Sequence, residues 1–244
     1  MENHTPEAVR EWIASYKYKI ELHAHSSPVS PCSEFPPAEL LRILHEERYD
    51  GVVITNHFYE KNKCMEAEDP VGVYLDDYYR CREAGEAYGM KVYLGAEYRF
   101  RENSNDYLVF GADEKMLRET YNRLDMTLAD FYREYHSEKT LIIQAHPFRN
   151  GMIVQPGEVL DGIEAFNMHP NHNGRVAVAA RHARTEELPI ITVGTDLHHP
   201  GHQGVSALRA RSLPENEEEL VGLLRSRDYL FEIGGCPLLP YDIF

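Results

Sequence analysis

Five apolar segments of this sequence share one design, because each is strand-like and ends in a histidine or an acidic residue. The segments cover residues 20–25, 52–57, 92–97, 141–147 and 190–198. Helical patterns separate them, and strands that alternate with helices are typical of a parallel sheet. The carboxyl ends of parallel strands lie at the same edge of such a sheet. We therefore predict an α/β fold that gathers these polar side chains at that edge.

The number of strand–helix repeats favours a closed barrel over an open sheet, which is the alternative. A chain of 244 residues is long enough to form such a barrel as one domain. We expect a single domain over residues 1–244, with residues 1–17 as a helical extension packed on it. Within that extension, a short amphipathic helix over Pro6–Tyr16 is expected to cover one end of the core.

The remaining elements are placed by periodicity and by turn residues. Helices are expected over residues 37–48, 78–88, 114–121, 128–136, 172–187 and 215–226, and further strands over 107–110, 162–166 and 228–233. Residues 58–77 show no clear period, so we expect a lid or an edge insertion there. Ser and Pro make residues 26–37 an irregular loop. This loop leaves directly from the first strand end and is expected to overhang any site there.

The amino-acid composition limits the kinds of molecule that this protein is expected to bind. The formal net charge of −15 argues against binding to nucleic acid, because affinity for nucleic acid comes mostly from Lys and Arg that neutralise phosphates. The four cysteines show no metal-ribbon spacing and are expected to be reduced thiols. We find no secretory leader and no apolar run near the roughly 20 residues of a membrane span. We therefore expect a cytoplasmic protein that has no membrane partner.

The end of the first predicted strand, in residues 20–25, carries the histidines from which we predict a metal centre. In a strand, His23 and His25 point to the same face, and together with Asp196 they could complete one site. Glu97 could bridge to a second ion that His146 also binds. A structural role for the two histidines is the alternative, and the four other strand ends argue against it. Glu97 follows apolar residues in a strand and is expected to be buried. A metal partner is favoured for it, because an unpaired carboxylate is costly to bury.

Two further histidines extend this predicted centre. His57 and His198 are spaced to serve another position, although they could instead line the site or form hydrogen bonds. Histidine together with carboxylate suits zinc, iron or manganese, whereas magnesium and calcium prefer sites made of oxygen alone. Two such ions about 3.5–4 Å apart would hold a phosphate and activate water near neutral pH.

Five motifs in this arrangement resemble those of the PHP (polymerase and histidinol phosphatase) family. They are His23-Ala24-His25, Ile54-Thr55-Asn56-His57, Glu97, Ala145-His146-Pro147 and Gly194-Thr195-Asp196-Leu197-His198. The resemblance runs from about Lys19 to Arg209, and the segment 162–167 looks like the strand before the last metal motif of the family. It implies a distorted TIM-like (β/α)7 barrel with two or three metal ions at the carboxyl ends of the strands. It also implies hydrolysis of phosphoesters by water that the metal activates.

Three positions depart from the motifs of the family. Asn56 stands where the family usually has Asp, so an orienting charge on His57 is expected to be lost. The loop after the histidine pair usually carries an acidic or histidine ligand, and here only Glu34 could substitute. A histidine is often found where this chain has Leu108, which would remove a ligand from the second ion. We therefore expect one or two divalent ions, and at most three, of Zn, Mn or Fe.

The function expected from these motifs is hydrolysis of a small phosphomonoester, either histidinol-phosphate-like or nucleotide-like. Arg149, three residues after His146, is expected to bind the phosphate and to stabilise the charge that develops on it. His57 or His198 could protonate the leaving oxygen where no metal holds them. His169 follows a strand end and could line the substrate pocket, although it could equally be a surface residue.

Two alternatives remain open at the level of sequence. The first is a metal-binding or regulatory protein of the same fold with impaired catalysis, which Asn56 and Leu108 favour. The second is a metal-dependent hydrolase of C–N bonds, because related barrels use similar sets of ligands. The loops carry no motif that identifies the substrate, and substrate choice in barrel enzymes depends mainly on loops.

Overall fold

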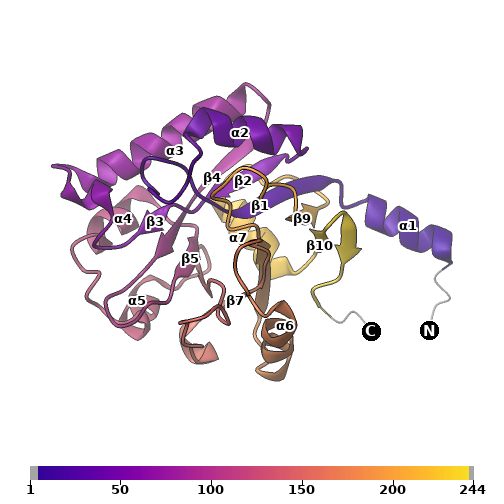
Figure 1. Cartoon of the computed structure of the whole chain (residues 1–244). Coiled ribbons are helices and arrows are strands. Elements are labelled where there is room, and N and C mark those ends of the chain that lie inside the picture. The colour runs from indigo at the N-terminus through magenta and orange to yellow at the C-terminus, as the bar shows by residue number, and fades with distance from the viewer. Residues whose placement is uncertain (1–4, 242–244) are drawn as a thin grey trace.

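The computed structural model describes residues 5–241, and one curled sheet runs through it (Figure 1). The strands are β1 (Tyr18–Ala24), β2 (Gly51–Ile54), β3 (His57–Phe58), β4 (Lys91–Tyr98), β5 (Tyr107–Phe110), β6 (Leu141–Gln144), β7 (Gly162–Asn167), β8 (Ile190–Gly194), β9 (Ser206–Ala210), β10 (Leu230–Ile233) and β11 (Cys236–Leu238). The helices are α1 (Pro6–Ala14), α2 (Pro37–Glu46), α3 (Pro70–Glu86), α4 (Glu114–Thr120), α5 (Leu128–Tyr135), α6 (Val176–Thr185) and α7 (Glu217–Ser226). Two short 3-10 turns are η1 (Lys63–Glu66) and η2 (Gly157–Val159).

Strands β1, β2 and β4 to β8 form the wall of a distorted barrel, as predicted. They are hydrogen-bonded in the order β1-β2-β4-β5-β6-β7-β8, with β3 paired to the end of β4. The sheet curls until the chain after β8 meets β1 through a parallel bridge between Ala24 and Leu197. Two backbone hydrogen bonds make this bridge, from His25 N to Leu197 O and from Leu197 N to His23 O, both 3.1 Å long. The seam therefore closes beside the predicted ligands.

Strand β5 corrects the expectation of a wholly parallel sheet. It runs antiparallel to both of its neighbours, β4 and β6. Only residues 99–106 join β4 to β5, and a connection this short cannot make the crossover that parallel strands require. A second antiparallel part lies outside the barrel, where β9, β10 and β11 continue the sheet from the other edge of β1.

Helices α2 and α3 cover the outer face of the sheet near β2 and β4 (Figure 1). In α2, the buried stripe includes Leu40, Leu41 and Leu44 as expected. Helix α3 begins eight residues earlier than the predicted start at Tyr78, so it replaces the end of the expected lid. Asp69 caps it by accepting a hydrogen bond from Gly72 N at 3.0 Å, and Pro70 follows in the first turn. An Asp–Pro pair is a recognised start signal for a helix.

Helix α1 does not cover the core. It projects from the body of the molecule (Figure 1), and none of its residues is buried. Near its carboxyl end, the guanidinium of Arg211 sits 5.9 Å from the centroid of the Trp12 ring, and it lies 4.0 Å from that of Tyr16 just after the helix. No helix between residues 5 and 241 has the length and apolar character that crossing a membrane requires.

Candidate metal centre

The structure brings all the predicted ligands together at the mouth of the barrel. They come from the ends of β1, β4, β6 and β8 and from β3, and they are His23, His25, His57, Glu97, His146, Asp196 and His198. The imidazole ring of His25 lies 4.2 Å from that of His198, 4.5 Å from that of His57 and 5.0 Å from that of His23, measured between ring centroids. His57 is half-buried and the others are buried.

Glu97 and Asp196 are the two carboxylates at the middle of this cluster. Glu97 Oε1 lies 3.3 Å from His23 Nε2 and 3.2 Å from His146 Nε2. Its other oxygen, Oε2, lies 2.6 Å from His57 Nδ1 and 3.6 Å from His25 Nε2. Each oxygen of Glu97 therefore faces a different pair of imidazoles, as a carboxylate that bridges two ions would.

Asp196 faces the end of β1 from the neighbouring end of β8, across the barrel seam. Its Oδ1 atom lies 3.5 Å from His23 Nε2, 3.6 Å from His25 Nε2 and 3.2 Å from His198 Nδ1. Asp196 follows β8, and the bridge between Ala24 and Leu197 fixes this part of the chain against β1. The barrel seam therefore determines the position of Asp196 relative to the His-x-His pair.

These distances test whether the residues fit a metal ion. Separations of 3.3–3.6 Å among His23, His25, Glu97 and Asp196 exceed those of good hydrogen bonds. Ligand atoms about 2.0–2.2 Å from a tetrahedral ion lie about 3.3–3.6 Å from each other. The Nε2 atoms of His23 and His25 are also buried without a hydrogen-bond partner, which is costly for a polar atom. The residues present therefore fit a divalent ion.

Three groups of side chains within residues 5–241 could each hold an ion. They are His23 with His25 and Glu97; Glu97 with Asp106 and His146; and His25 with His57 and His198. Within each group, the ligand atoms lie within 4.8 Å of one another. His25 and Glu97 each belong to two groups, so the three positions are contiguous.

Asp106 was not identified from the sequence. It bears on the expectation that Leu108 removes a ligand from the second ion. Leu108 is buried, whereas Asp106, just before β5, places Oδ2 3.7 Å from His146 Nε2. Arg99 also holds this carboxylate, with hydrogen bonds of 2.6 and 2.8 Å to its two oxygens. The second position thus keeps an acidic side chain although Leu108 stands where a histidine was expected. The only signal for it in the sequence was a carboxylate at the entrance to an apolar strand.

Glu164, on β7, is a second residue that was not singled out. Its Oε1 atom lies 2.8 Å from His23 Nδ1, and its Oε2 atom accepts hydrogen bonds from His146 N at 3.1 Å and Asn167 Nδ2 at 3.0 Å. A carboxylate on Nδ1 fixes the tautomer of His23 and leaves Nε2 to face the cluster. Gly194 makes room for this contact, because a Cβ atom there would lie 2.4 Å from Glu164 Oε1.

Burial of so many acidic groups sets the electrostatics of the centre. Burial raises the pKa of a carboxyl group, but the charges of His57 and His23 outweigh that effect and hold the pKa of Glu97 well below its usual range. The charges of Glu164, Asp196 and Glu97 likewise outweigh the effect of burial on His23 and raise its pKa well above its usual range. Burial and the like charges of His198 and His57 lower the pKa of His25. The charge of His23 and the hydrogen bonds from His198 and His25 likewise outweigh burial and hold the pKa of Asp196 well below its usual range, so Glu97 and Asp196 are the anionic groups that attract a cation.

The backbone at two of these strand ends has an unusual conformation. His146 has a φ angle of 31° and Asp196 a φ angle of 53°. Both values lie in the left-handed region, which residues other than glycine rarely adopt. Such conformations cost about 1–3 kcal/mol each and cluster at functional sites. Six residues other than glycine between residues 5 and 241 have such a φ angle, and two of them are these predicted ligands.

Asn56 does not have the effect expected from the missing acidic residue. Its Oδ1 atom accepts hydrogen bonds of 2.8 Å from both Ser26 N and Ser30 Oγ, and its Nδ2 atom donates to Asp77 Oδ2 at 2.8 Å. The charge that faces His57 comes from Glu97 instead. Asn56 therefore fixes the loop after β1, and the expected loss of an orienting charge on His57 is wrong.

The loop after β1 presents Cys32, and not Glu34, to the metal centre. Glu34 is exposed and pairs with His199 at 3.1 Å, so it does not substitute for a loop ligand. The Cys32 thiol interacts with the imidazoles of His57 and His198. Although desolvation opposes ionisation, these two imidazoles lower the pKa of the Cys32 thiol to about 6. No metal-ribbon spacing in the sequence pointed to this residue.

Arg149 and His169 lie at the rim of the cluster. Arg149 Nη1 lies 3.4 Å from Asp196 Oδ2, and its side chain is partly exposed. The ring of His169 lies 5.9 Å from that of His198. Burial, together with the like charges of neighbouring histidines, lowers the pKa of His169 to about 4. Its Nδ1 atom accepts a hydrogen bond from Asn171 N at 3.2 Å, so the neutral ring carries its proton on Nε2.

Comparison with solved structures identifies the architecture. A two-domain protein from Bacteroides vulgatus, which contains a predicted PHP-like metal-dependent phosphoesterase, superposes with a TM-score of 0.57 at 14% sequence identity. The alignment covers 88% of this chain and 64% of that protein, so this chain spans less than two thirds of its length. This chain has the PHP-like fold. No family model matches the sequence, and no curated protein matches it.

The PHP-like fold is shared with a second solved structure of a different class. An amidohydrolase from Chromobacterium violaceum, with bound sulfate and no metal, superposes with a TM-score of 0.51 at 14% identity. The alignment covers 75% of this chain and 88% of that one. At this identity, both likenesses establish the fold alone. The activity must be argued from the site.

Proposed function

We propose that this protein is a metal-dependent phosphoesterase that hydrolyses a small phosphomonoester. The observation that carries the proposal is the contiguity of the three ligand groups, which share His25 and Glu97. Adjacent ions are suited to phosphoryl transfer because they can hold both the attacking and the leaving oxygen. When bound, divalent ions would lower the pKa of a water molecule and offset negative charge on the phosphate.

The residues that would hold the ions follow from the geometry. His23, His25 and Asp196 surround one position, and Glu97 lies between it and the position that His146 and Asp106 face. His57 and His198 flank the third position together with His25. Histidine with carboxylate is the donor set of zinc, iron and manganese, and we propose a divalent ion of this class.

Arg149 and His169 would bind the phosphate group. The guanidinium of Arg149 stands beside Asp196 and is partly exposed at the mouth, where it can donate two parallel hydrogen bonds to phosphate oxygens. His169, neutral with its proton on Nε2, can donate a hydrogen bond without adding a charge. Burial lowers the pKa of His198, but the hydrogen bond to Asp196, together with Cys32 and the charge of Asp196, outweighs this effect and raises it to about 9. A protonated His198 can give a proton to the leaving oxygen where no ion holds it.

A small substrate is favoured over nucleic acid by the charge of the chain. The net charge of −15 repels a long phosphate backbone, whereas a single phosphate can be held by local cations and by Arg149. The amidohydrolase with this fold holds sulfate, an anion whose shape resembles that of phosphate. Histidinol-phosphate-like and nucleotide-like monoesters fit this description equally well.

The first test is the metal content of the purified protein, with anomalous scattering to locate the ions. Two or more ions per chain at His23, Glu97 and Asp196 are expected. The same preparation, supplied with Mn²⁺, should hydrolyse 4-nitrophenyl phosphate, and the variant His23→Ala should lose this activity. His45→Ala is a matched control, because His45 is exposed on α2 and stands apart from the predicted ligands.

Two results would contradict the proposal. Absence of ions at these residues after incubation with Mn²⁺ or Zn²⁺ would favour the reading of a scaffold with impaired catalysis. Cleavage of an aryl amide without cleavage of the phosphate ester would favour a C–N hydrolase. The variant Arg149→Ala separates the two enzyme classes further. For a phosphoesterase, it should raise the KM and weaken inhibition by inorganic phosphate about tenfold or more while the ions stay bound.

A further inference from the structure

The loop between β1 and α2 places one serine hydroxyl between two of the strand ends that carry imidazoles. Ser30 is fully buried. Its Oγ atom lies 2.8 Å from Asn56 Oδ1, 3.0 Å from His57 N and 3.2 Å from His25 Nδ1. A hydroxyl group has one proton to donate and two lone pairs that accept. These three contacts therefore use all of its hydrogen-bonding capacity, and each of them has one possible direction.

Asn56 fixes the direction of the first contact. Its Oδ1 atom accepts a hydrogen bond of 2.8 Å from the backbone N–H of Ser26, so this atom is the carbonyl oxygen of the amide and not its nitrogen. The Nδ2 atom points the other way and donates to Ser26 Oγ at 2.9 Å and to Asp77 Oδ2 at 2.8 Å. Because a carbonyl oxygen cannot donate, Ser30 must give its proton to Asn56.

The two other contacts then determine where His25 carries its proton. The backbone N–H of His57 donates to Ser30 Oγ. Since the only proton of Ser30 is given to Asn56, Ser30 can bind His25 Nδ1 only as an acceptor. The proton of the neutral imidazole therefore lies on Nδ1, and Nε2 carries a lone pair.

This lone pair faces negative charge in the metal-free protein. His25 Nε2 is buried without a hydrogen-bond partner, and it lies 3.6 Å from both Glu97 Oε2 and Asp196 Oδ1. A proton on Nε2 would be attracted by both carboxylates, whereas a lone pair there is repelled by them. The hydrogen bonds of Ser30 therefore select the tautomer that suits a bound cation over the one that would suit the metal-free site.

We propose that Ser30 is a positioning residue of the metal centre, whose hydroxyl holds the proton of His25 on Nδ1 and so keeps Nε2 open to an ion. This inference rests on the proposed function, because it assigns Nε2 to a metal ion. His25 belongs to two of the three ligand groups, whereas His23, which contacts Glu164, belongs to one. Loss of the Ser30 hydroxyl should therefore weaken the binding of ions at two positions.

Three variants of the full chain separate this role from a general effect on the loop. Ser30→Ala removes the hydroxyl, and Ser30→Thr keeps one. Ser33→Ala is the matched control, because Ser33 is a buried serine of the same loop whose Oγ donates to the backbone oxygen of His25 at 2.8 Å and not to its ring. All three variants should retain the circular dichroism spectrum of the wild type.

Heteronuclear NMR of the metal-free protein at pH 8 measures the tautomer directly, because a protonated imidazole nitrogen and a bare one differ widely in chemical shift. The signals that are missing from His25→Gln identify His25. In the wild type and in Ser33→Ala, the proton of His25 should be on Nδ1. In Ser30→Ala it should move to Nε2, where it faces the two carboxylates.

The affinity for Zn²⁺ is the second measurement, made by competition with a chromophoric chelator. Ser30→Ala should weaken the binding of two ions about tenfold or more, as loss of an orienting partner does in other metal sites. Ser30→Thr should restore most of this affinity, and Ser33→Ala should leave it nearly unchanged. Equal losses in Ser30→Ala and Ser33→Ala would overturn the inference, because the loop as a whole would then be responsible.

The outcomes distinguish this inference from the proposed function. A wild-type protein whose His25 carries its proton on Nε2 overturns the role of Ser30 and leaves the metal centre standing, and this result does not depend on the folding of any Ser30 variant. Wild-type protein that binds zinc at His25 but cleaves no phosphate ester overturns the proposed function alone. Wild-type protein that binds no zinc at any of the ligand groups overturns both.

Discussion

Glu164 Oε1 lies 2.8 Å from Nδ1 of His23, and both side chains are buried. This contact orients the imidazole so that Nε2 faces Glu97 and Asp196. We expect Glu164→Gln to lower the affinity for the first metal ion roughly 10–100-fold, as loss of an orienting carboxylate does in other metal sites. A competition titration with a chromophoric chelator measures this affinity.

The control for Glu164→Gln is Glu158→Gln, which removes an exposed carboxylate from η2. It should leave metal affinity unchanged. Both variants should retain the circular dichroism spectrum of the wild type, so that a loss of affinity is not a loss of fold. Unchanged affinity in Glu164→Gln would show that the tautomer of His23 does not depend on this carboxylate.

The contact between Asn56 and Asp77 leads us to expect that an acidic residue at position 56, although usual in the family motif, would destabilise this protein. Asn56 Nδ2 donates to Asp77 Oδ2 at 2.8 Å, and burial raises the pKa of Asp77. The variant Asn56→Asp, which restores the residue usual in the family, would place two carboxyl groups in contact. We expect it to lower the free energy of unfolding by roughly 2–4 kcal/mol at neutral pH. Denaturation with urea measures the change.

The double variant Asn56→Asp/Asp77→Asn provides the decisive comparison. It exchanges the two groups, so a donor again faces a carboxylate, and most of the lost stability should return. The destabilisation by Asn56→Asp alone should also shrink as the pH falls, because protonation of one carboxyl group removes the repulsion. A single variant as stable as the wild type at pH 8 would rule out this account.

Glu21 makes the stability of the metal-free protein depend on pH. It is fully buried on β1, and burial raises its pKa from 4.5 to about 7 against hydrogen bonds from Thr195 and His23. The folded state therefore binds a proton more tightly than the unfolded state does. The stability that this proton contributes is complete below pH 4.5 and is lost as the pH rises through 7. At about 1.4 kcal/mol per pKa unit, the loss is on the order of 3 kcal/mol.

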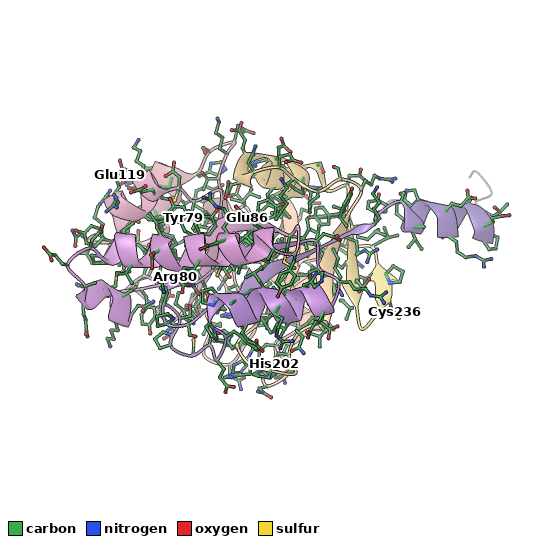
Figure 2. The ribbon with its side chains drawn as sticks, turned by 90° about the horizontal axis from the view of Figure 1, so that it is seen from above. Tyr79, Arg80, Glu86, Glu119, His202 and Cys236 are labelled. Carbon is green, nitrogen blue, oxygen red and sulfur yellow. The ribbon has the colours of Figure 1, made fainter. Side chains whose placement is uncertain are left out.

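The variant Glu21→Gln tests this assignment because it imitates the protonated form. Its free energy of unfolding, measured with urea after removal of metal, should match that of the wild type at pH 4.5 and exceed it at pH 8. Glu119→Gln, on the exposed surface of α4 (Figure 2), should show no such crossover. If Glu21→Gln were less stable than the wild type at pH 8, ionised Glu21 would be the favoured form.

The sequence indicates the barrel and most of the centre because both depend on local patterns. An apolar run with a polar last residue marks a strand end, and parallel strands bring such ends together whatever the loops do. His23, His25, Glu97, His146 and Asp196 are found in this way. The reversal at β5 was also within reach, since eight residues between β4 and β5 cannot hold a crossover helix.

The residues that the sequence does not reveal are placed by tertiary contacts. Cys32 sits in a loop without periodicity, and its position depends on the hydrogen bonds of Ser30 and Ser33 to distant strands. Asp106 reaches the cluster only because β5 runs antiparallel, which brings the start of that strand to the mouth. Glu164 lies within a strand and not at its end, so the pattern that identified the ligands could not include it.

Gly194 shows how closely β8 packs on the centre and gives the last prediction. A Cβ atom at this position would lie 2.5 Å from His23 Cβ, which is attached to the backbone and cannot move away. We expect Gly194→Ala to cost about 1–3 kcal/mol of stability and to weaken metal binding by displacing His23.

Gly222→Ala is the matched control, because a Cβ there meets nothing within 4 Å, and alanine in the interior of α7 should stabilise the protein by about 0.5–1 kcal/mol. Thermal unfolding with and without Zn²⁺ measures both effects. A Gly194→Ala variant that gains as much stability from zinc as the wild type does would mean that His23 tolerates the shift, and that β8 does not determine the geometry of the first position.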